Sequence, residues 1–92
     1  MAEVLCERIS RGMRDSERTV AIRDAYGQRE FLCVEVDFLT ATGDKYYLPV
    51  GVVHEDKQQG LVLIELPQEG ARGNWRLWVR SSDLLPTNGV SA

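Results

Sequence analysis

Apolar and polar residues alternate along two runs near the end of the chain, Leu61–Leu66 and Trp75–Arg80. Because successive side chains of a strand point to opposite faces, each run predicts a strand with one apolar face. A loop with Pro67 and two glycines separates the runs, as in an antiparallel hairpin. We expect the two apolar faces to cover one core, lined by Val62, Ile64 and Leu66 from the first run and by Trp75, Leu77 and Val79 from the second.

Three runs upstream alternate in the same way and are separated by polar turns: Arg18–Asp24, Arg29–Phe38 and Lys45–His54. One apolar and one polar face per strand is typical of an antiparallel sheet. The alternation predicts that the second run turns Leu32, Val34, Val36 and Phe38 inward, and the third run Tyr46, Leu48, Val50 and Val52.

The third run also contains Pro49 and Gly51. Proline has no N–H for the strand ladder, so the run is expected to be an edge strand or to bend at Pro49. Gly51 predicts a β-bulge or a tight curve nearby.

The first run, Glu3–Ser10, fits two structures. As a helix it would place Leu5, Ile9 and Met13 near one stripe, although a glycine weakens that pattern. As a strand it alternates like the rest of the chain. Because every later run predicts a strand, we interpret it as a strand, followed by a polar loop over Arg11–Glu17.

The last strand is followed by the sequence SSDLLP. A serine cap predicts a single helical turn that returns Leu84 and Leu85 to the core and ends at Pro86. Thr87–Ala92 has no pattern, and we expect it to be frayed. No repeat or linker divides the remainder, so residues 1–86 are predicted to form one domain.

The ending W-x-L-W-V-R-S-S-D-L-L resembles the close of SH3-like barrels, where a long strand is followed by a 3₁₀ turn and a short return. The resemblance covers about the last third of the chain and implies a fold, not an activity. With the regular turns, it predicts an all-β protein: a small antiparallel SH3-like barrel of five to six short strands with a 3₁₀ turn near the C-terminus. The paired-tyrosine motif of signalling SH3 domains is not recognisable in the first loop, so binding of proline-rich peptides is not implied.

The net charge of −3 and pI of about 5.1 argue against non-specific nucleic-acid binding, which requires lysine and arginine to neutralise phosphates. A basic cluster near the N-terminus is interspersed with acids, and we interpret it as a solvated face of mixed charge; its members are Arg8, Arg11, Arg14 and Arg18.

No apolar run approaches the roughly 20 residues of a membrane span. The start, MAEVLCERIS, lacks the apolar region of a secretory signal, so we expect a cytoplasmic protein. Two distant cysteines, Cys6 and Cys33, are then interpreted as buried apolar residues and not as a disulfide.

Catalytic chemistry is difficult to assemble from these residues. A histidine can transfer protons near neutral pH, but His54 is the only one and no motif supplies a nucleophile. Glu35 and Asp37 share the polar face of one strand, where carboxylates are usually solvated. One histidine and two cysteines do not complete a zinc site. We expect a protein without enzymatic activity, metal or cofactor.

The most informative surface feature is Trp78, which the alternation places outward between Arg76 and Arg80. Tryptophan and arginine are the residues that most often dominate protein interfaces. The same outward register adds further apolar residues that would enlarge the patch: Phe31, Leu61 and Leu63. We therefore predict a protein-interaction module or a self-associating subunit. The alternative interpretation is that Trp78 is covered by another segment.

A second hypothesis places nucleic acid on the other exposed aromatic residues. Tyr46 and Tyr47 are adjacent, so one of them must face outward. Together with Arg72 and Arg76, Tyr47 would form a stacking platform for single-stranded nucleic acid, although the acidic total charge makes this partner the less favoured one.

Overall fold

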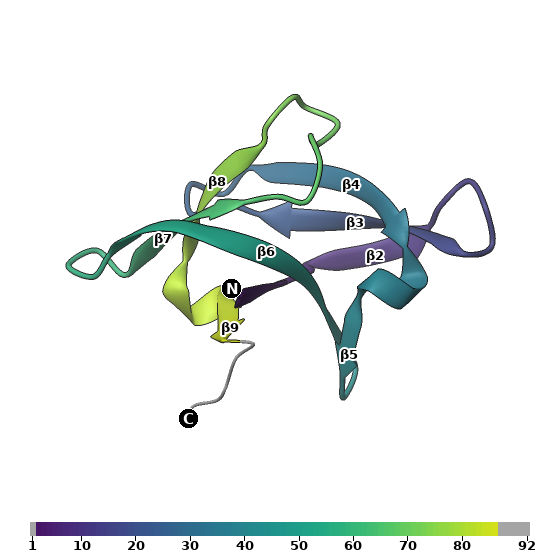
Figure 1. Ribbon diagram of the computed structural model, residues 1–92, viewed down its shortest axis with the longest axis horizontal. Coiled ribbons are helices and arrows are strands. Elements are labelled where there is room, and N and C mark those ends of the chain that lie inside the picture. The colour runs from purple at the N-terminus through teal and green to yellow at the C-terminus, as the bar shows by residue number, and fades with distance from the viewer. Residues whose placement is uncertain (1, 87–92) are drawn as a thin grey trace.

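A computed structural model describes residues 2–86, which form an all-β structure with antiparallel pairing throughout (Figure 1). Thr87–Ala92, predicted to be frayed, lies outside the described residues. Among residues 2–86 there is no helix long and apolar enough to cross a membrane. The elements in chain order are β1 (Ala2–Leu5), β2 (Arg8–Arg11), β3 (Glu17–Arg23), β4 (Arg29–Glu35), the 3₁₀ turn η1 (Val36–Phe38), β5 (Thr40–Thr42), β6 (Lys45–Asp56), β7 (Leu61–Glu65), β8 (Arg76–Arg80), the 3₁₀ turn η2 (Ser81–Asp83) and β9 (Leu84–Pro86).

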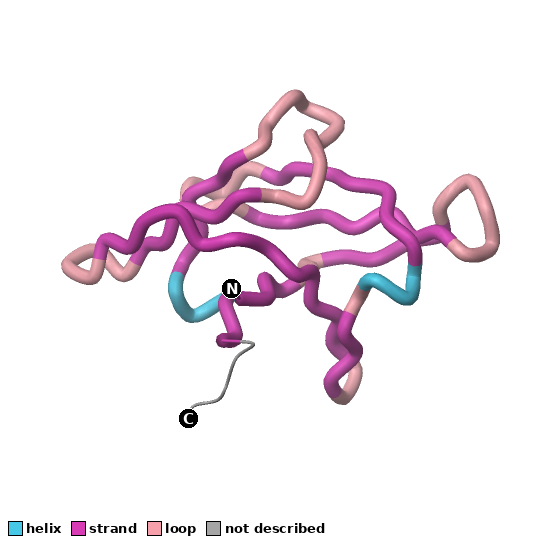
Figure 2. The backbone as a smooth tube through the Cα atoms, viewed as in Figure 1, coloured by secondary structure: helices cyan, strands magenta, loops and turns pink. Residues whose placement is uncertain are grey.

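The strands form two sheets, and the 3₁₀ turns η1 and η2 lie between strands (Figure 2). The larger sheet has the order β8–β7–β6–β1–β9, with β5 also paired to β6, and the smaller sheet has the order β2–β3–β4. The chain passes from the larger to the smaller sheet at Cys6 and Glu7. Their backbone N–H groups donate to the carbonyls of Tyr46 in β6 and Ala21 in β3, at 2.9 and 2.8 Å.

Neither sheet closes into a barrel within the described part of the chain. The structure thus confirms an all-β, antiparallel fold, while the SH3-like barrel stays a prediction. The predicted 3₁₀ turn near the C-terminus is confirmed as η2.

One cluster of buried side chains joins the two sheets, because it draws on strands of both. The predicted alternation is confirmed for most of β4, β6, β7 and β8, which each turn two or more apolar residues into this cluster. Its buried members are Ala2, Val4, Cys6, Val20, Ile22, Leu32, Val34, Leu48, Val50, Val62, Ile64, Leu66, Leu77 and Val79.

The predicted strand over Arg29–Phe38 is too long. Strand β4 ends at Glu35, and Val36–Phe38 forms η1 instead, which leaves Phe38 43% exposed and outside the core. Pairing between β3 and β4 ends at Glu17 and Glu35, and the N–H of Val36 donates to the carbonyl of Ser16 at 2.7 Å. Without a strand partner beyond this point, the chain turns toward β5.

The predicted irregularity in β6 is present, but β6 is not an edge strand. It lies between β1 and β7, and Pro49 pairs only with Glu3 of β1 because pairing with β7 begins at Gly51. The register then shifts between Val52 and His54, as expected of a β-bulge. Val52 pairs with the buried Ile64 just before the shift, but it is 40% exposed and is not part of the buried core as predicted.

Both ends of the described chain lie in the larger sheet. The N-terminal run is extended, not helical, but it forms two strands, β1 and β2, which belong to different sheets. Strand β9 pairs with β1, with Val4 opposite Leu84. Leu84 packs against the core as predicted, whereas Leu85 is 39% exposed.

Truncation of the core should be far more costly than truncation of the bulge. Ile64 is fully buried, so Ile64→Ala is expected to lower the free energy of unfolding by about 2–5 kcal/mol. Val53 is 40% exposed, and Val53→Ala should change it by about 0.5 kcal/mol or less. Chemical denaturation of both variants measures the difference, and equal losses would contradict this packing.

Candidate functional site

Three side chains form a row across the outer face of the larger sheet. The register places His54 of β6 opposite Leu63 of β7, and Leu63 opposite Trp78 of β8. The His54 and Trp78 rings meet edge to face, with centroids 6.1 Å apart and planes at 90°. Strands two positions apart in a sheet are separated by roughly 9–10 Å, so the two rings lean toward each other above Leu63. This contact explains why Trp78 and Leu63 are half-buried on the face opposite the core.

Two arginines flank this row. Arg76 and Arg80 are exposed on the same side of β8 as Trp78, while the intervening residues point into the core. Arg76 forms an exposed ion pair with Glu65, with Nη2 and Oε1 3.5 Å apart, which contributes little to stability. Arg80 lies opposite Leu61 of β7. We call this surface the Trp78 face; it consists of His54, Leu61, Leu63, Arg76, Trp78 and Arg80.

Trp75 does not line the core, contrary to the prediction. It precedes β8, in the bend that ends the β7–β8 loop, and it is 51% exposed. Its carbonyl accepts a hydrogen bond from the N–H of Leu66 at 2.8 Å, so the backbone continues the ladder by one bond. Because regular strand geometry begins only at Arg76, the period of two no longer fixes the side to which the indole points. The prediction that Trp75 faces inward is wrong, whereas Trp78 lies on the outward face of β8 as predicted.

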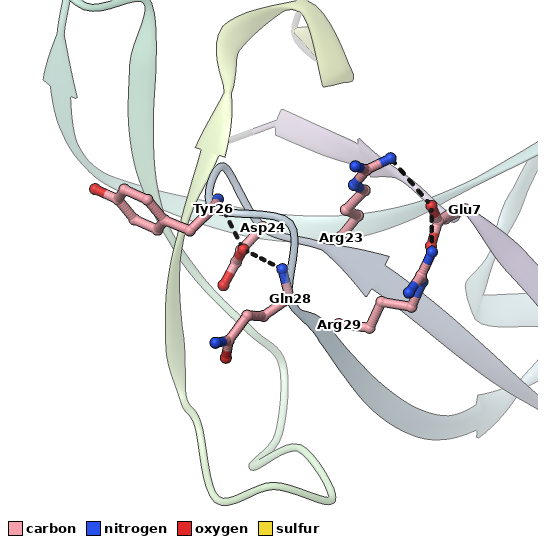
Figure 3. A network of polar contacts seen from close by, with 6 residues as sticks. All are labelled: Glu7, Arg23, Asp24, Tyr26, Gln28 and Arg29. Carbon is pink, nitrogen blue, oxygen red and sulfur yellow. Dashed lines mark hydrogen bonds and ion pairs between the residues drawn. The ribbon is translucent and has the colours of Figure 1, made fainter.

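The turn between β3 and β4 rests against the free edge of β8. The N–H of Ala25 donates to the carbonyl of Trp78 at 2.7 Å. Asp24 holds the turn, because its Oδ1 accepts the backbone N–H groups of Tyr26 and Gln28, both at 2.9 Å (Figure 3). Tyr26 is 70% exposed and projects from this turn away from the arginines (Figure 3). Sequence reasoning identified the turn but not its exposed tyrosine beside β8.

A second polar group lies around Glu7 at the sheet crossing. Arg29 donates through Nε and Nη2 to its carboxylate, and Nη1 of Arg23 lies 3.6 Å from Oε2 (Figure 3). The hydrogen bond from Arg29 is the main cause that lowers the pKa of Glu7, with smaller effects of the neighbouring arginine charges, and partial desolvation opposes it. Glu7 and Arg23 line a small depression of about 170 Å³ together with Arg80. Arg80 therefore borders both the Trp78 face and this polar group.

Glu30 is the one charged side chain that is buried within residues 2–86, with 1% of its surface exposed. Its Oε1 accepts the backbone N–H groups of Phe31 and Arg72 at 2.8 and 2.9 Å. Its Oε2 accepts the backbone N–H and the side-chain amide of Asn74 at 3.1 and 2.9 Å. One carboxylate on β4 thus holds the loop that precedes β8.

The same loop covers the edge of β4. The N–H of Ala71 donates to the carbonyl of Phe31 at 2.8 Å, and Gln68 Nε2 donates to the carbonyl of Cys33 at 3.1 Å. Gly70 lies directly against the clamp, because a Cβ built there would be 2.2 Å from Cδ of Glu30. A residue with a side chain at position 70 would displace the carboxylate, so this approach requires glycine.

Four hydrogen bonds determine the ionisation of Glu30. Burial by itself raises the pKa of a carboxyl group, but the bonds from the N–H groups of Arg72 and Phe31 and from Asn74 outweigh it and hold the pKa of Glu30 below the ordinary value of 4.5. The sequence signal for this residue is its position in the alternation of β4. Glu30 occupies the same register as Leu32, on the inward face of β4.

The residues of the nucleic-acid hypothesis lie in separate places. Tyr47 is half-buried in β6, opposite Leu5 of β1 on one side and Thr40 of β5 on the other. Arg72 lies in the β7–β8 loop, where its Nη1 donates to the carbonyl of Arg29 at 3.3 Å. Arg76 points from β8 toward Glu65, as described above. Within residues 2–86 no hydrogen bond or cation–π contact joins Tyr47 to either arginine, so the geometry adds no support to a stacking platform.

The two cysteines have different environments. Both are free thiols, but only Cys6 is buried as predicted, and burial raises its pKa to about 12. Cys33 is exposed on β4, with its Sγ 3.5 Å from Oε1 of Glu17. Among the described residues, His, Cys, Asp and Glu do not gather in any group of three or more that could hold a metal ion.

No known family model, curated protein or solved structure matches this chain. The contacts around Trp78 and Glu30 therefore carry the functional inference by themselves.

Replacing the buried carboxylate should release the β7–β8 loop. In Glu30→Gln an amide group would face two N–H donors, so the free energy of unfolding should fall by roughly 2–4 kcal/mol. Glu55 is exposed, and Glu55→Gln should have almost no effect. Chemical denaturation of both variants at neutral pH measures the difference, and similar stabilities would contradict the clamp.

The clamp also predicts a pH dependence. Because the folded-state pKa of Glu30 lies below its ordinary value of 4.5, its ionised form contributes stability that is fully present above pH 4.5 and is lost as the pH falls through the folded-state pKa. The stabilities of the wild type and Glu30→Gln should therefore converge under acidic conditions. Denaturation curves recorded over a pH series test this, and a constant gap between the two proteins would be the opposite result.

Proposed function

We propose that this protein is a non-enzymatic interaction module that meets another protein through the Trp78 face. The single observation that carries the proposal is the row of His54, Leu63 and Trp78, with an arginine on each side of the tryptophan. An apolar centre with a polar and charged rim is the usual anatomy of a protein interface. Tryptophan and arginine are also the residues whose truncation most often weakens binding.

The surroundings enlarge this apolar centre. The β-bulge of β6 leaves Val53 40% exposed next to His54. Tyr26 is an exposed aromatic residue in the turn that contacts the edge of β8 through Ala25. Phe31, which we also predicted for this patch, lies in β4 of the smaller sheet and is not part of it.

The Trp78 face is held in place before any partner arrives. On one side β8 is paired with β7, and on its free edge Ala25 donates to the carbonyl of Trp78. The His54 ring further restricts the indole. A surface that is already ordered loses less conformational entropy on binding, so more of its contact energy is available for affinity.

Two further expectations, about the fold and the cellular location, belong to the same proposal. The sequence β8–η2–β9, with β9 returning to pair with β1, supports the resemblance to SH3-like barrels. The two free thiols support a reducing, cytoplasmic environment.

Trp78→Ser should abolish capture of a partner, whereas Trp75→Ser should not. The two variants make the same chemical change, but Trp75 lies outside the Trp78 face. Tagged wild type and both variants are compared in pull-downs from source cells, and the protein recovered is then titrated in purified form by calorimetry. We expect at least about a tenfold weaker affinity for Trp78→Ser alone. Equal affinities for all three proteins, after circular dichroism has shown equal folding, would refute the assignment of the face.

The narrower form of the proposal is that the partner at this face is a second copy. Light scattering on purified protein over a concentration series tests it. Association that is lost in Trp78→Ser and kept in Trp75→Ser supports this form, and a monomer at every concentration removes it.

A further inference from the structure

An open groove crosses Phe38 and Pro67 and leads from the smaller sheet to the larger one. Two depressions of about 440 and 330 Å³ share these two residues. The buried side chains of Val34, Val50 and Leu66 also line the groove, and Phe38 is 43% exposed within it. An apolar group of a partner would find apolar contacts along this groove.

The rim of the groove is acidic. Glu17 and Glu35 line the first depression and Glu65 the second, whereas no lysine or arginine among the described residues lines either one. Glu17 and Glu35 also stand directly opposite each other in the β3–β4 ladder. Like charges in this position destabilise a sheet, and within residues 2–86 neither of these two carboxylates has an ion-pair partner. Glu65 differs from them because it is paired with Arg76.

The loop between β2 and β3 has the complementary chemistry. Met13 at its tip is 95% exposed, and the exposed Arg14 follows it. Two backbone hydrogen bonds of 3.0 Å fix the turn, from the N–H of Gly12 to the carbonyl of Glu17 and from the N–H of Glu17 to the carbonyl of Arg14. Arg11, the last residue of β2, is paired with Asp15, which leaves Arg14 as the unpaired cation next to Met13 among the described residues. Methionine adapts well to irregular apolar surfaces.

We infer that two copies of the chain form a symmetric dimer through this loop and groove. Met13 of each copy lies on the apolar floor of the partner's groove, and Arg14 lies between Glu17 and Glu35 of that partner. The cation relieves the repulsion between the two carboxylates, which is the source of the charge complementarity. This interface is separate from the Trp78 face and does not depend on the function proposed for it.

The position of the loop allows both exchanges at once. Glu17 ends the loop and also lines the groove, so loop and groove are neighbours in each copy. When both elements lie at the same end of a molecule, a two-fold axis beside that end can bring each loop to the other copy's groove. With Met13 95% exposed, the loop of a single copy does not occupy its own groove.

Charge reversal gives a direct test by light scattering. Wild type should dimerise as the concentration rises, and added salt should weaken the dimer. In Glu35→Lys, Arg14 of the loop meets a lysine in the partner's groove. In Arg14→Glu, the loop carries a glutamate that meets Glu17 and Glu35. Each variant alone should therefore have a dimer dissociation constant roughly tenfold or more above that of the wild type. An equal mixture of the two variants should dimerise more strongly than either variant alone, because one contact is then the native one and in the other the new glutamate meets the new lysine beside Glu17.

Matched controls make the same charge changes elsewhere. Asp44→Lys and Lys57→Glu alter exposed turn residues that do not line the groove, so both should dimerise like the wild type. Both reversed variants leave the residues of the Trp78 face unchanged, so any association that persists in them arises outside this interface. A monomeric wild type, undiminished association of the reversed variants, or failure of their mixture to associate would each overturn the inference. Circular dichroism of every variant confirms that it is folded.

Discussion

The arrangement of this protein depends on one buried carboxylate. Removing a charge from water is costly unless hydrogen bonds replace the lost hydration, and Glu30 receives four of them. Three of the four come from residues 42 or 44 positions later in the chain. The interaction therefore fixes the distance between the edge of the smaller sheet and the loop that enters β8. Loss of the carboxylate would leave the N–H groups of Arg72 and Asn74 without their acceptor at the same time.

This constraint also determines how the surface around Trp78 is presented. Strand β8 begins directly after the loop that Glu30 holds, and its free edge is covered in part by the turn at Ala25. Both supports come from the β3–β4 hairpin of the smaller sheet. The larger sheet thus provides the strands that carry the proposed interface. The β3–β4 hairpin of the smaller sheet holds the loop before β8 and covers part of the free edge of β8.

Alternation of apolar and polar residues was sufficient to predict most of the strands and much of the core. It failed where regular pairing stops. Val52 is the last residue of β6 paired with β7 before the bulge, Phe38 lies in a 3₁₀ turn, and Trp75 precedes the first residue of its strand. In each case the period continues in the sequence although the ladder does not.

The clamp could not be predicted for a different reason. The register placed Glu30 among inward-facing residues, but its partners are backbone N–H groups of a distant loop. Every residue type except proline carries this group, so the sequence does not show which N–H groups the carboxylate contacts. The groove around Phe38 and Pro67 is similar, because residues from several separate elements meet there. By contrast, the grouping of Arg76, Trp78 and Arg80 on one face required only local geometry, and the structure places them as expected.

The position of β1 has a consequence for the order in which the protein can be assembled during synthesis. This strand precedes the other described strands in the chain, yet its two neighbours in the sheet are β6 and β9, so its pairing is complete only when residues through Pro86 are present. The β2–β4 meander has only local partners and can form on a nascent chain while β1 remains unpaired. Until β6 has been synthesised, β1 has two open edges, and it keeps one open edge until β9 follows; chaperones or neighbouring chains can compete for such an unpaired edge.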